Sequence, residues 1–259
     1  MTHPWFQGTT VPRVLAHRGL VTQADASHAV AENSFAAVAA AHAAGCVYVE
    51  SDCHLTSDGV VVLFHDADLT RVTGDPRRVA DVTVRELEAL MAGRGGLITL
   101  AQALDAFPDV RFNLDVKAPT AAGAVGTIIA PHADRVLVTS FSDARRRDAL
   151  AAAETAGSGI LPATSAGTST IVRLLVAVAA HSDRLVSRPL RGIDAIQVPE
   201  RKGRVRVVTP RLIDAAHRSG VEVHVWTVND PADMRRLVDM GVDGIVTDRA
   251  DVALRTLRT

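Results

Sequence analysis

The stretch YVESDCHLTSDGVVVLFHD, residues 48–66, places acids and histidines in what otherwise looks like buried strand. Because successive side chains on a strand point to opposite faces, Glu50, Asp52 and His54 share one face. Two carboxylates on one buried face are costly unless they have a partner. Either nearby arginines form ion pairs with them, or their oxygen atoms bind a hard divalent cation.

The same stretch predicts a β-hairpin. Asp58-Gly59 is a strong hairpin signal between two apolar runs. A two-residue turn there folds the chain back and puts Asp52 opposite His65, so the hairpin returns a histidine to the two acids. The returning run VVVLFH, residues 60–65, is then an extra strand.

The rest of the chain alternates short β-rich runs with alanine-rich helical stretches, which favours a parallel sheet. A length of 259 residues fits two small domains or one α/β barrel. Nine runs are one too many for an eight-stranded barrel, and setting residues 60–65 aside leaves eight, so we predict an α/β fold of the (β/α)8 TIM-barrel type. The eight runs are RVLAH (13–17), YVESD (48–52), RFNLDV (111–116), VLVTS (136–140), GILP (159–162), AIQVP (195–199), EVHVWT (222–227) and GIVT (244–247).

Several helix boundaries carry local signals. Thr83 and Thr99 are each followed three residues later by Glu or Gln, the spacing of a capping box. Asp230 precedes a proline, as at the start of a helix, and Gly241 marks the end of the helix begun there.

The composition excludes several classes of partner. A formal net charge of −1 gives no overall field that attracts nucleic acid or a membrane. Aromatic residues make up only 3% of the chain, which argues against surfaces that stack bases. No run approaches eighteen apolar residues, and the start MTHPWFQGTTVPRV has neither a charged nor an apolar segment of a signal peptide. We therefore expect a cytoplasmic protein with no nucleic-acid partner and no integral membrane segment.

Other polar residues stand at the ends of predicted strands. His17 and Arg18 follow the first apolar run, and Asn113, Asp115 and Lys117 alternate along RFNLDVK. Each alone fits a structural role, such as a core histidine or a solvated strand end. Several at successive carboxyl ends of barrel strands predict a catalytic site, since such barrels carry their chemistry there.

Nine motifs occur in order over nearly the whole chain, and together they resemble the glycerophosphodiester phosphodiesterase family. The resemblance implies one domain over residues 1–259, a (β/α)8 barrel with a small insertion at approximately 66–98. It also implies hydrolysis of a small-molecule glycerophosphodiester to sn-glycerol 3-phosphate and an alcohol, with one divalent cation, Ca2+ or Mg2+. The motifs are HRG (17–19), ENS (32–34), ESD (50–52), TSDGVVVLFHD (56–66), DLTRVTG (68–74), TLAQAL (99–104), NLDVK (113–117), HVWTVN (224–229) and DGIVTDRAD (243–251).

The resemblance also assigns roles to individual residues. His17 and His65 match the general acid and base. Metal binding falls to three carboxylates and substrate binding to five other side chains. The metal-binding group is Glu50, Asp52 and Asp115, and the substrate-binding group is Arg18, Lys117, Glu32, Asn33 and Trp226.

Two features depart from the family pattern. Asp115 stands where the family usually has glutamate, and its side chain is one methylene shorter, so we expect the metal to sit differently or to be bridged by water. The loop between HRG and ENS, residues 20–31, is longer than the resemblance implies, and it lies at the mouth of the predicted site, where it bears on the leaving-group preference.

The chemistry explains this set of residues. A metal can neutralise an anionic phosphodiester and stabilise charge that develops in the transition state. Arg18 and Lys117 can offset the remaining negative charge of the carboxylates and hold the phosphate oxygens. Histidine suits both proton transfers because its ordinary pKa of about 6.5 is close to the working pH.

Alternatives remain open at this point. The glycerol 2-hydroxyl attacks phosphorus to give a cyclic phosphate, or water attacks directly. A Schiff-base lyase would use Lys117 as its nucleophile, and a binding module would hold a phosphodiester without cleaving it. A lysophospholipase D-like enzyme would act at a membrane, where the basic segment RKGRVR, residues 201–206, either makes peripheral contact with anionic lipid or is simply solvated.

Overall fold

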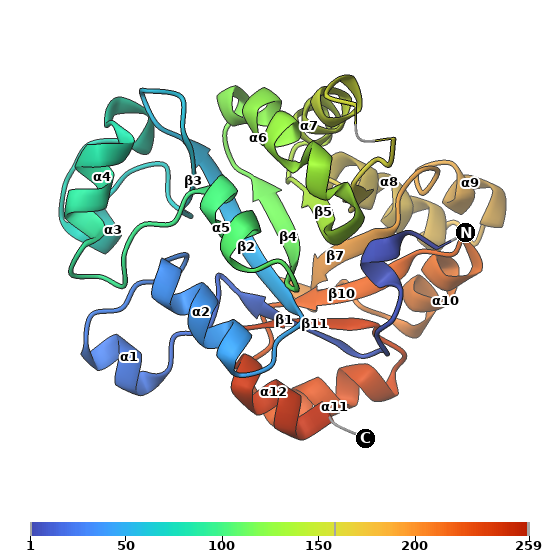
Figure 1. Ribbon diagram of the computed structural model, residues 1–259. Coiled ribbons are helices and arrows are strands. Elements are labelled where there is room, and N and C mark those ends of the chain that lie inside the picture. Colours follow the sequence, from blue (N-terminus) through green and yellow to red (C-terminus); the bar gives the residue numbers. More distant parts are fainter. Residues whose placement is uncertain (1, 158, 258–259) are drawn as a thin grey trace.

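The computed structural model describes residues 2–157 and 159–257. Within these residues, eight parallel strands form a nearly closed barrel with helices around it (Figure 1). Neighbouring strands follow the order β6-β5-β4-β2-β1-β11-β10-β7, and a parallel bridge between Ser165 and Ala195 joins the two ends of this row. The predicted (β/α)8 barrel is confirmed. Its strands are β1 (Arg13–His17), β2 (Tyr48–Leu55), β4 (Arg111–Val116), β5 (Val136–Thr139), β6 (Ala163–Thr164), β7 (Ala195–Pro199), β10 (Glu222–Trp226) and β11 (Gly244–Thr247).

One predicted barrel strand is misplaced. The sequence predicts a strand at GILP (159–162), whereas β6 is the two-residue strand that follows it. Gly159 has a φ of 74°, a left-handed conformation that interrupts a strand. Ile160 and Leu161 are exposed rather than buried in the sheet. A short apolar run alone does not distinguish a strand from a loop.

The hairpin in the opening stretch is present, but its predicted register is wrong by one residue. The extra strand β3 (Val61–Leu63) pairs antiparallel with β2 outside the barrel row, as predicted. Cys53 is opposite Leu63, and the N–H of Phe64 donates to the carbonyl of Asp52, so Asp52 does not face His65. The turn holds three residues, 57–59, instead of two, and its last residue is a glycine with a φ of 82°.

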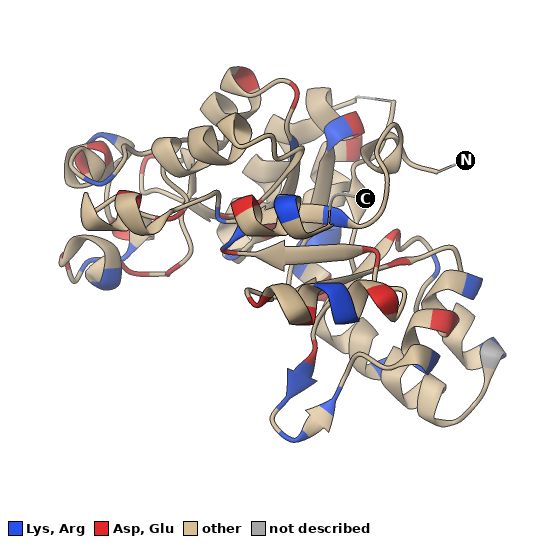
Figure 2. Ribbon diagram, turned by 90° about the horizontal axis from the view of Figure 1, so that it is seen from below, with Lys and Arg blue, Asp and Glu red and all other residues tan. Residues whose placement is uncertain are grey.

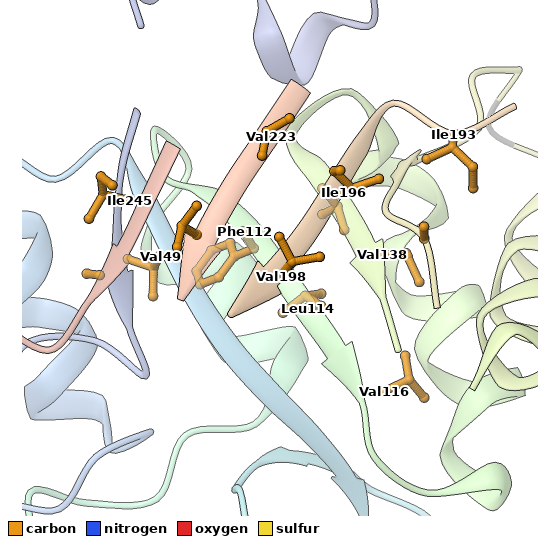
Figure 3. Packing of buried hydrophobic residues seen from close by; sticks show 14 of the residues in the cluster. Val49, Phe112, Leu114, Val116, Val138, Ile193, Ile196, Val198, Val223 and Ile245 are labelled. Carbon is orange, nitrogen blue, oxygen red and sulfur yellow. The ribbon is translucent and has the colours of Figure 1, made fainter. Parts of the chain in front are cut away.

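Helices cover the outside of the barrel and bury its outward-facing side chains. Val49, Phe112 and Leu114 lie in this layer and are fully buried (Figure 3). Burial of each such side chain contributes about 1.5–3 kcal/mol. The covering helices are α2 (Phe35–Ala43), α5 (Leu100–Ala106), α6 (Ala122–Ile129), α7 (Asp143–Thr155), α8 (Thr168–Ala179), α9 (Asp183–Ser187), α10 (Pro210–Arg218), α11 (Pro231–Asp239) and α12 (Ala250–Leu257). Short 3-10 turns are η1 (Pro4–Phe6), η2 (Val79–Asp81), η3 (Pro119–Ala121) and η4 (Ala130–Arg135).

The local helix signals are borne out. Thr83 and Thr99 form capping boxes at the starts of α4 (Val84–Met91) and α5. The side chain of Asp230 accepts hydrogen bonds at the start of α11, and Gly241 follows that helix with a φ of 97°.

The turn η1 closes one end of the barrel. Trp5 is fully buried, and its Nε1 donates to the carbonyl of Phe112 at 3.1 Å. Its own carbonyl accepts from Arg111, the first residue of β4, at 2.9 Å. The N-terminal ends of the strands are therefore covered by this turn, which leaves the carboxyl ends for a site.

The segment expected as an insertion, 66–98, contains α3 (Thr70–Thr73) and α4 (Val84–Met91) beside η2. Figure 1 shows α3 and α4 next to β3, to one side of the barrel. Leu69, Leu87 and Met91 belong to a hydrophobic cluster distinct from the main core, and this cluster includes Val62 of β3. The backbone N–H of Ala31, in the loop that contains α1 (Gln23–Ser27), donates to Arg94. The exact extent of the insertion stays a prediction.

A second hairpin lies in the loop between β7 and α10. It consists of β8 (Arg201–Lys202) and β9 (Val205–Arg206), within the segment read from sequence as a basic loop. Figure 2 shows this hairpin projecting away from the rest of the chain, with basic residues on both arms. In the described part of the chain, no helix has the length and apolar character needed to cross a bilayer.

Candidate active site

Three adjacent strands bring the predicted acids and His17 to one end of the barrel. His17 ends β1 and pairs in register with Glu50 of β2. Asp52, two residues further along β2, pairs in register with Asp115 of β4. Because all three strands run parallel, these side chains meet near the carboxyl ends of the strands, as the sequence predicts.

Asp52 is the centre of the cluster and is 1% exposed. Asn33 donates from Nδ2 to Asp52 Oδ2 at 2.9 Å, and Arg18 Nε lies 3.2 Å from the same oxygen. Lys117 Nζ lies 2.9 Å from Asp52 Oδ1. The hydroxyl of Ser51 donates to Asn33 Oδ1, which fixes the orientation of the amide. The two substrate-binding cations of the prediction therefore both contact this carboxylate.

Lys117 also contacts Asp115, the acid on the neighbouring strand β4. Its Nζ lies 2.6 Å from Asp115 Oδ2. Burial by itself lowers the pKa of Lys117, but the charges of Asp52 and Asp115 outweigh it and raise the pKa above the ordinary value. Burial raises the pKa of Asp115 despite the nearby ammonium. Asp115 Oδ1 is buried without a hydrogen-bond partner, so this acid has an unused ligand atom.

Glu50, the third acid of the cluster, is also buried. Burial raises its pKa to about 8, and the negative charges of Asp52 and Asp115 act in the same direction. The nearby His17, whose Nε2 lies 3.9 Å from Glu50 Oε2, opposes the shift. The same oxygen accepts from the backbone N–H of Arg18 at 3.2 Å. Three buried acids thus repel one another, a situation that a bound cation would relieve.

His17 is oriented by an aspartate from the other end of the chain. Its Nδ1 lies 2.6 Å from Oδ1 of Asp248, which follows β11. Asn229 donates to the second oxygen of Asp248 at 2.7 Å and accepts from Thr247 at 2.9 Å. Burial lowers the pKa of His17, but the hydrogen bond to Asp248 and the charge of Glu50 together raise it.

His65, two residues after the end of β3, has an equivalent arrangement. Its Nδ1 lies 2.6 Å from Oδ1 of Asp66, the next residue along the chain. Its carbonyl lies 3.2 Å from Nε2 of the buried His54, which acts as the donor because a carbonyl only accepts. Burial lowers the pKa of His54, which favours the neutral form of that ring. The side chain of His54 therefore holds the backbone of His65.

Arg71, in α3, connects Asp66, the partner of His65, to Glu32. Its Nε lies 2.6 Å from Asp66 Oδ2 and its Nη2 lies 2.6 Å from Glu32 Oε1. Glu32 also accepts from Arg18 Nη1 at 2.7 Å. We call this connected set the arginine network. Its members, in order, are Asp52, Arg18, Glu32, Arg71, Asp66 and His65.

The backbone around Arg18 is unusual for its residue types. Arg18 and Asn33 have φ values of 56° and 57°, the left-handed region, which costs a non-glycine residue roughly 1–2 kcal/mol. The N–H of Asn33 donates to the carbonyl of Arg18 at 2.8 Å, so the two strained residues support each other. A Cβ on Gly19 would lie 2.6 Å from the carbonyl carbon of Ala37, so only glycine permits this approach of the loop to α2.

Two aromatic rings lie beside the charged groups. Trp226 ends β10, and its ring centroid lies 5.9 Å from that of Phe141 in an edge-on arrangement. Lys117 Nζ lies 5.5 Å from the centroid of Phe141, which is 59% exposed. These rings form an apolar wall next to Lys117, and Trp226 is one of the predicted substrate-binding side chains.

Comparison with known proteins shows to which family the chain belongs. Residues 17–252 match the sequence profile of the Glycerophosphoryl diester phosphodiesterase family. The chain belongs to this family. The predicted resemblance is thereby confirmed over nearly the whole chain.

Individual relatives agree with this membership. A Mycobacterium tuberculosis protein named "Probable glycerophosphodiester phosphodiesterase 2" is 38% identical over 242 residues, which cover 92% of this chain and 88% of the relative. A lysophospholipase D of Mus musculus is 24% identical over 262 residues, covering 84% and 79% of the two chains.

Solved structures share the fold. An Oleispira antarctica phosphodiesterase, solved in complex with the product sn-glycerol-3-phosphate, superimposes with a TM-score of 0.72 at 20% identity and covers 96% of this chain and 98% of its own. A Thermotoga maritima glycerophosphodiester phosphodiesterase gives a TM-score of 0.70 at 24% identity, with coverage of 97% and 100%. As a member of the glycerophosphoryl diester phosphodiesterase family, the chain is a phosphodiesterase, as its sequence predicts.

The carboxylates of this family member fit a divalent cation by their chemistry. Hard cations such as Ca2+ and Mg2+ bind oxygen ligands, and Asp115 Oδ1 is a buried oxygen with no other partner. As the side chains stand, the described residues include no group of three or more His, Cys, Asp or Glu arranged around a metal position. The Lys117 ammonium lies between Asp52 and Asp115 and offsets their charge there.

Some residues of the site went unassigned in the sequence prediction. Asp248 lies within the motif DGIVTDRAD (243–251), and it supports the site through its contact with His17. Asp66 and Arg71 lie within motifs shared with the family but received no role. Phe141 follows β5 and was missed. The one sequence signal for a role of Asp66 was its position directly after the predicted catalytic residue His65.

Proposed function

We propose that this family member hydrolyses glycerophosphodiesters to sn-glycerol 3-phosphate and an alcohol, with one divalent cation and with proton transfer by His17 and His65. The observation that carries the proposal is that each histidine is held through Nδ1 by its own aspartate, 2.6 Å away, beside a buried cluster of acids. The names of the relatives support the same reaction.

Glu50, Asp52 and Asp115 are the proposed holders of the cation. When bound, Ca2+ or Mg2+ would supply a Lewis acid that neutralises the phosphate. Asp115, with its shorter side chain, has a buried oxygen without a hydrogen-bond partner. The oxygen atoms of the three side chains match the preference of both ions for hard ligands.

Arg18 and Lys117 are the proposed phosphate-binding groups. Arg18 Nε is buried and has no aligned hydrogen-bond acceptor, although it lies 3.2 Å from Asp52. A phosphate oxygen would satisfy this donor, and a guanidinium can bind two such oxygens at once. Lys117, shared by Asp52 and Asp115, carries the charge needed to hold a second oxygen.

The histidines complete the proton transfers through Nε2, since Nδ1 of each contacts an aspartate. In the proposed route, one histidine removes the proton of the glycerol 2-hydroxyl, and that oxygen attacks phosphorus. The bond from phosphorus to the alcohol oxygen breaks, and the alcohol leaves with a proton from the other histidine. Water then opens the cyclic phosphate. A substrate that lacks the 2-hydroxyl tests this route, because turnover of that substrate at the normal rate would favour direct attack by water.

The Schiff-base alternative is not supported by the environment of Lys117. A Schiff-base lysine must lose its proton to attack a carbonyl. Contacts with two carboxylates raise the pKa of Lys117, so it stays protonated at neutral pH. Its position instead suits a phosphate contact.

A test of the proposal measures release of sn-glycerol 3-phosphate from soluble glycerophosphodiesters. His17→Asn and His65→Asn are each expected to lower kcat about 100-fold or more, the range of general acid–base catalysis. His217→Asn is the matched control, because His217 also contacts an aspartate, Asp243, at 2.7 Å but lies away from the site. Normal kcat in either site variant would contradict the assigned role.

A second candidate function is cleavage of lysophospholipids. A relative of 24% identity is named a lysophospholipase D, and the basic β8–β9 hairpin is the feature of this chain that favours contact with lipid. Release of choline from lysophosphatidylcholine, compared with release from glycerophosphocholine, distinguishes the two substrates. A higher kcat/KM for the acylated substrate would favour this second function.

A further inference from the structure

The β8–β9 hairpin is a projection on the catalytic side of the barrel. It lies in the loop that follows the carboxyl end of β7, the end of the barrel where the site residues meet. Its base is held by Glu200, whose carbonyl accepts from the N–H groups of Val207 and Val208 at 2.9 and 3.2 Å. The two strands between them form a short antiparallel ladder. The hairpin is thus a built element with a fixed base.

Four of the six residues in the hairpin are basic. Arg201, Lys202, Arg204 and Arg206 are all exposed. Within the described residues, none of these four side chains forms an ion pair with an acid, whereas the nearby Arg236 contacts two. A chain that is balanced overall, with 28 basic and 29 acidic residues, therefore concentrates uncompensated positive charge on this hairpin.

The acids at the base of the hairpin do not cancel this charge. Glu200 and Asp233 lie 2.8 and 2.6 Å from the same nitrogen of Arg236. They line a pocket of about 420 Å³ that also includes Asn229, and Asn229 contacts the aspartate that holds His17. The acids thus face the pocket beside the site. Arg201 also lines this pocket, whereas Lys202, Arg204 and Arg206 are not among its lining residues.

The hairpin also exposes an apolar side chain between two of its charges. Val205 is 65% exposed and stands between Arg204 and Arg206. A basic element with an apolar side chain suits the interface of an anionic bilayer, where the charges meet head groups and the apolar group meets the acyl boundary. The hairpin has no aromatic residue, so it lacks the stacking surface of single-stranded nucleic-acid binders.

We infer that the β8–β9 hairpin docks the protein on an anionic phospholipid surface. Docking brings the pocket beside His17 close to the bilayer. The inference goes beyond the proposed function, because hydrolysis of a soluble glycerophosphodiester needs no surface. Binding and hydrolysis are therefore measured separately, and each can fail without the other.

The test is co-sedimentation of the full chain with vesicles of phosphatidylcholine, with and without phosphatidylglycerol. The wild type is expected to bind the anionic vesicles only, and less as salt increases. The triple variant Lys202→Gln, Arg204→Gln, Arg206→Gln is expected to bind about 100-fold more weakly, about fivefold for each charge removed. Val205→Ser is expected to weaken binding about fivefold at constant charge.

The matched control removes three exposed arginines elsewhere: Arg78→Gln, Arg85→Gln and Arg147→Gln. It carries the same change of net charge and is expected to bind like the wild type. Equal loss in the control and the hairpin variant would overturn the inference, as would absence of wild-type binding to anionic vesicles. Hairpin-dependent binding to single-stranded RNA without binding to vesicles would assign a different partner and also overturn it. Unchanged hydrolysis of soluble glycerophosphocholine by the hairpin variant shows that it is folded.

Discussion

The Nδ1 atom of His17 lies 2.6 Å from Oδ1 of Asp248, and the two residues are 231 positions apart in the chain. The contact joins the end of the first barrel strand to the residue after the last. Because β1 and β11 are neighbours in the barrel, closure of the sheet itself creates this pair. The orientation of one proposed proton carrier thus depends on the complete fold.

Replacement of Asp248 by asparagine tests this positioning role. Asp248→Asn is expected to lower kcat about 100-fold, because the ring of His17 loses its charged partner, with little change in KM. The steady-state kinetics of a soluble glycerophosphodiester measure both parameters. Asp243→Asn is the control, since Asp243 contacts His217 away from the site. A rise of KM with normal kcat would instead assign Asp248 to substrate binding.

Arg71 offers a test of the arginine network. Arg71→Gln removes its contacts with Asp66 and Glu32 and is expected to lower kcat about tenfold through misplacement of His65. The side chain is 53% exposed, so the melting temperature is expected to stay nearly constant. Arg77→Gln is matched to it, because Arg77 pairs with Asp75 and Glu86 of the same segment without contacting the site. Equal kcat values for both variants would contradict the proposed role of Arg71.

Substitutions of Asp115, on β4, test the proposed cation site. Asp115→Asn is expected to lower the affinity for Ca2+ or Mg2+ about 100-fold, because it removes one charged ligand. Asp115→Glu keeps the carboxylate and is expected to retain binding. Titration calorimetry of each variant with each metal chloride measures the affinity. Unaltered affinity of Asp115→Asn would exclude this side chain as a ligand.

A separate prediction concerns the closed end of the barrel, where Glu222 lies 2.8 Å from the buried Arg13. Burial opposes ionisation of Glu222, but hydrogen bonds from Arg13 and His224 lower its pKa from 4.5 to about 2. Because the folded pKa is the lower one, the unfolded chain binds a proton first as the pH falls. The stabilisation is therefore complete above about pH 4.5 and is lost between there and about pH 2.

The variant Glu222→Gln measures this contribution. At neutral pH its free energy of unfolding is expected to be lower than that of the wild type by about 2–3 kcal/mol. The difference is expected to shrink as the pH falls, which urea unfolding at several pH values would show. A constant difference across this range would mean that the ionised form of Glu222 has no special stabilising role.

Most strands follow from local sequence, but some long-range details do not. Four predicted runs match strands residue for residue, because alternating or continuous apolar patterns specify them. These are the runs at 13–17, 111–116, 195–199 and 244–247. The strand β6 has only two residues, which is too short for an alternating or continuous apolar pattern to be recognised. The hairpin register depends on whether a turn holds two or three residues, and Asp58-Gly59 permits both.

In the site, too, some contacts could be predicted from local sequence and others could not. Residues that alternate on one strand, such as Glu50 and Asp52, could be placed together from sequence alone. The contacts of Arg71 and Asp248 could not, because they join segments that meet only after the barrel closes. The left-handed backbone of Arg18 also lacks a local signal, since arginine rarely adopts it.

The most direct test of the central claim measures sn-glycerol 3-phosphate release by chelator-treated enzyme, before and after addition of Ca2+ or Mg2+. The account predicts loss of activity on chelation and its recovery with one of these ions, in the wild type but not in Asp115→Asn. Full activity in the presence of chelator, with the metal content shown to be negligible, would contradict the proposed cation and leave the histidines and cationic side chains to act without it.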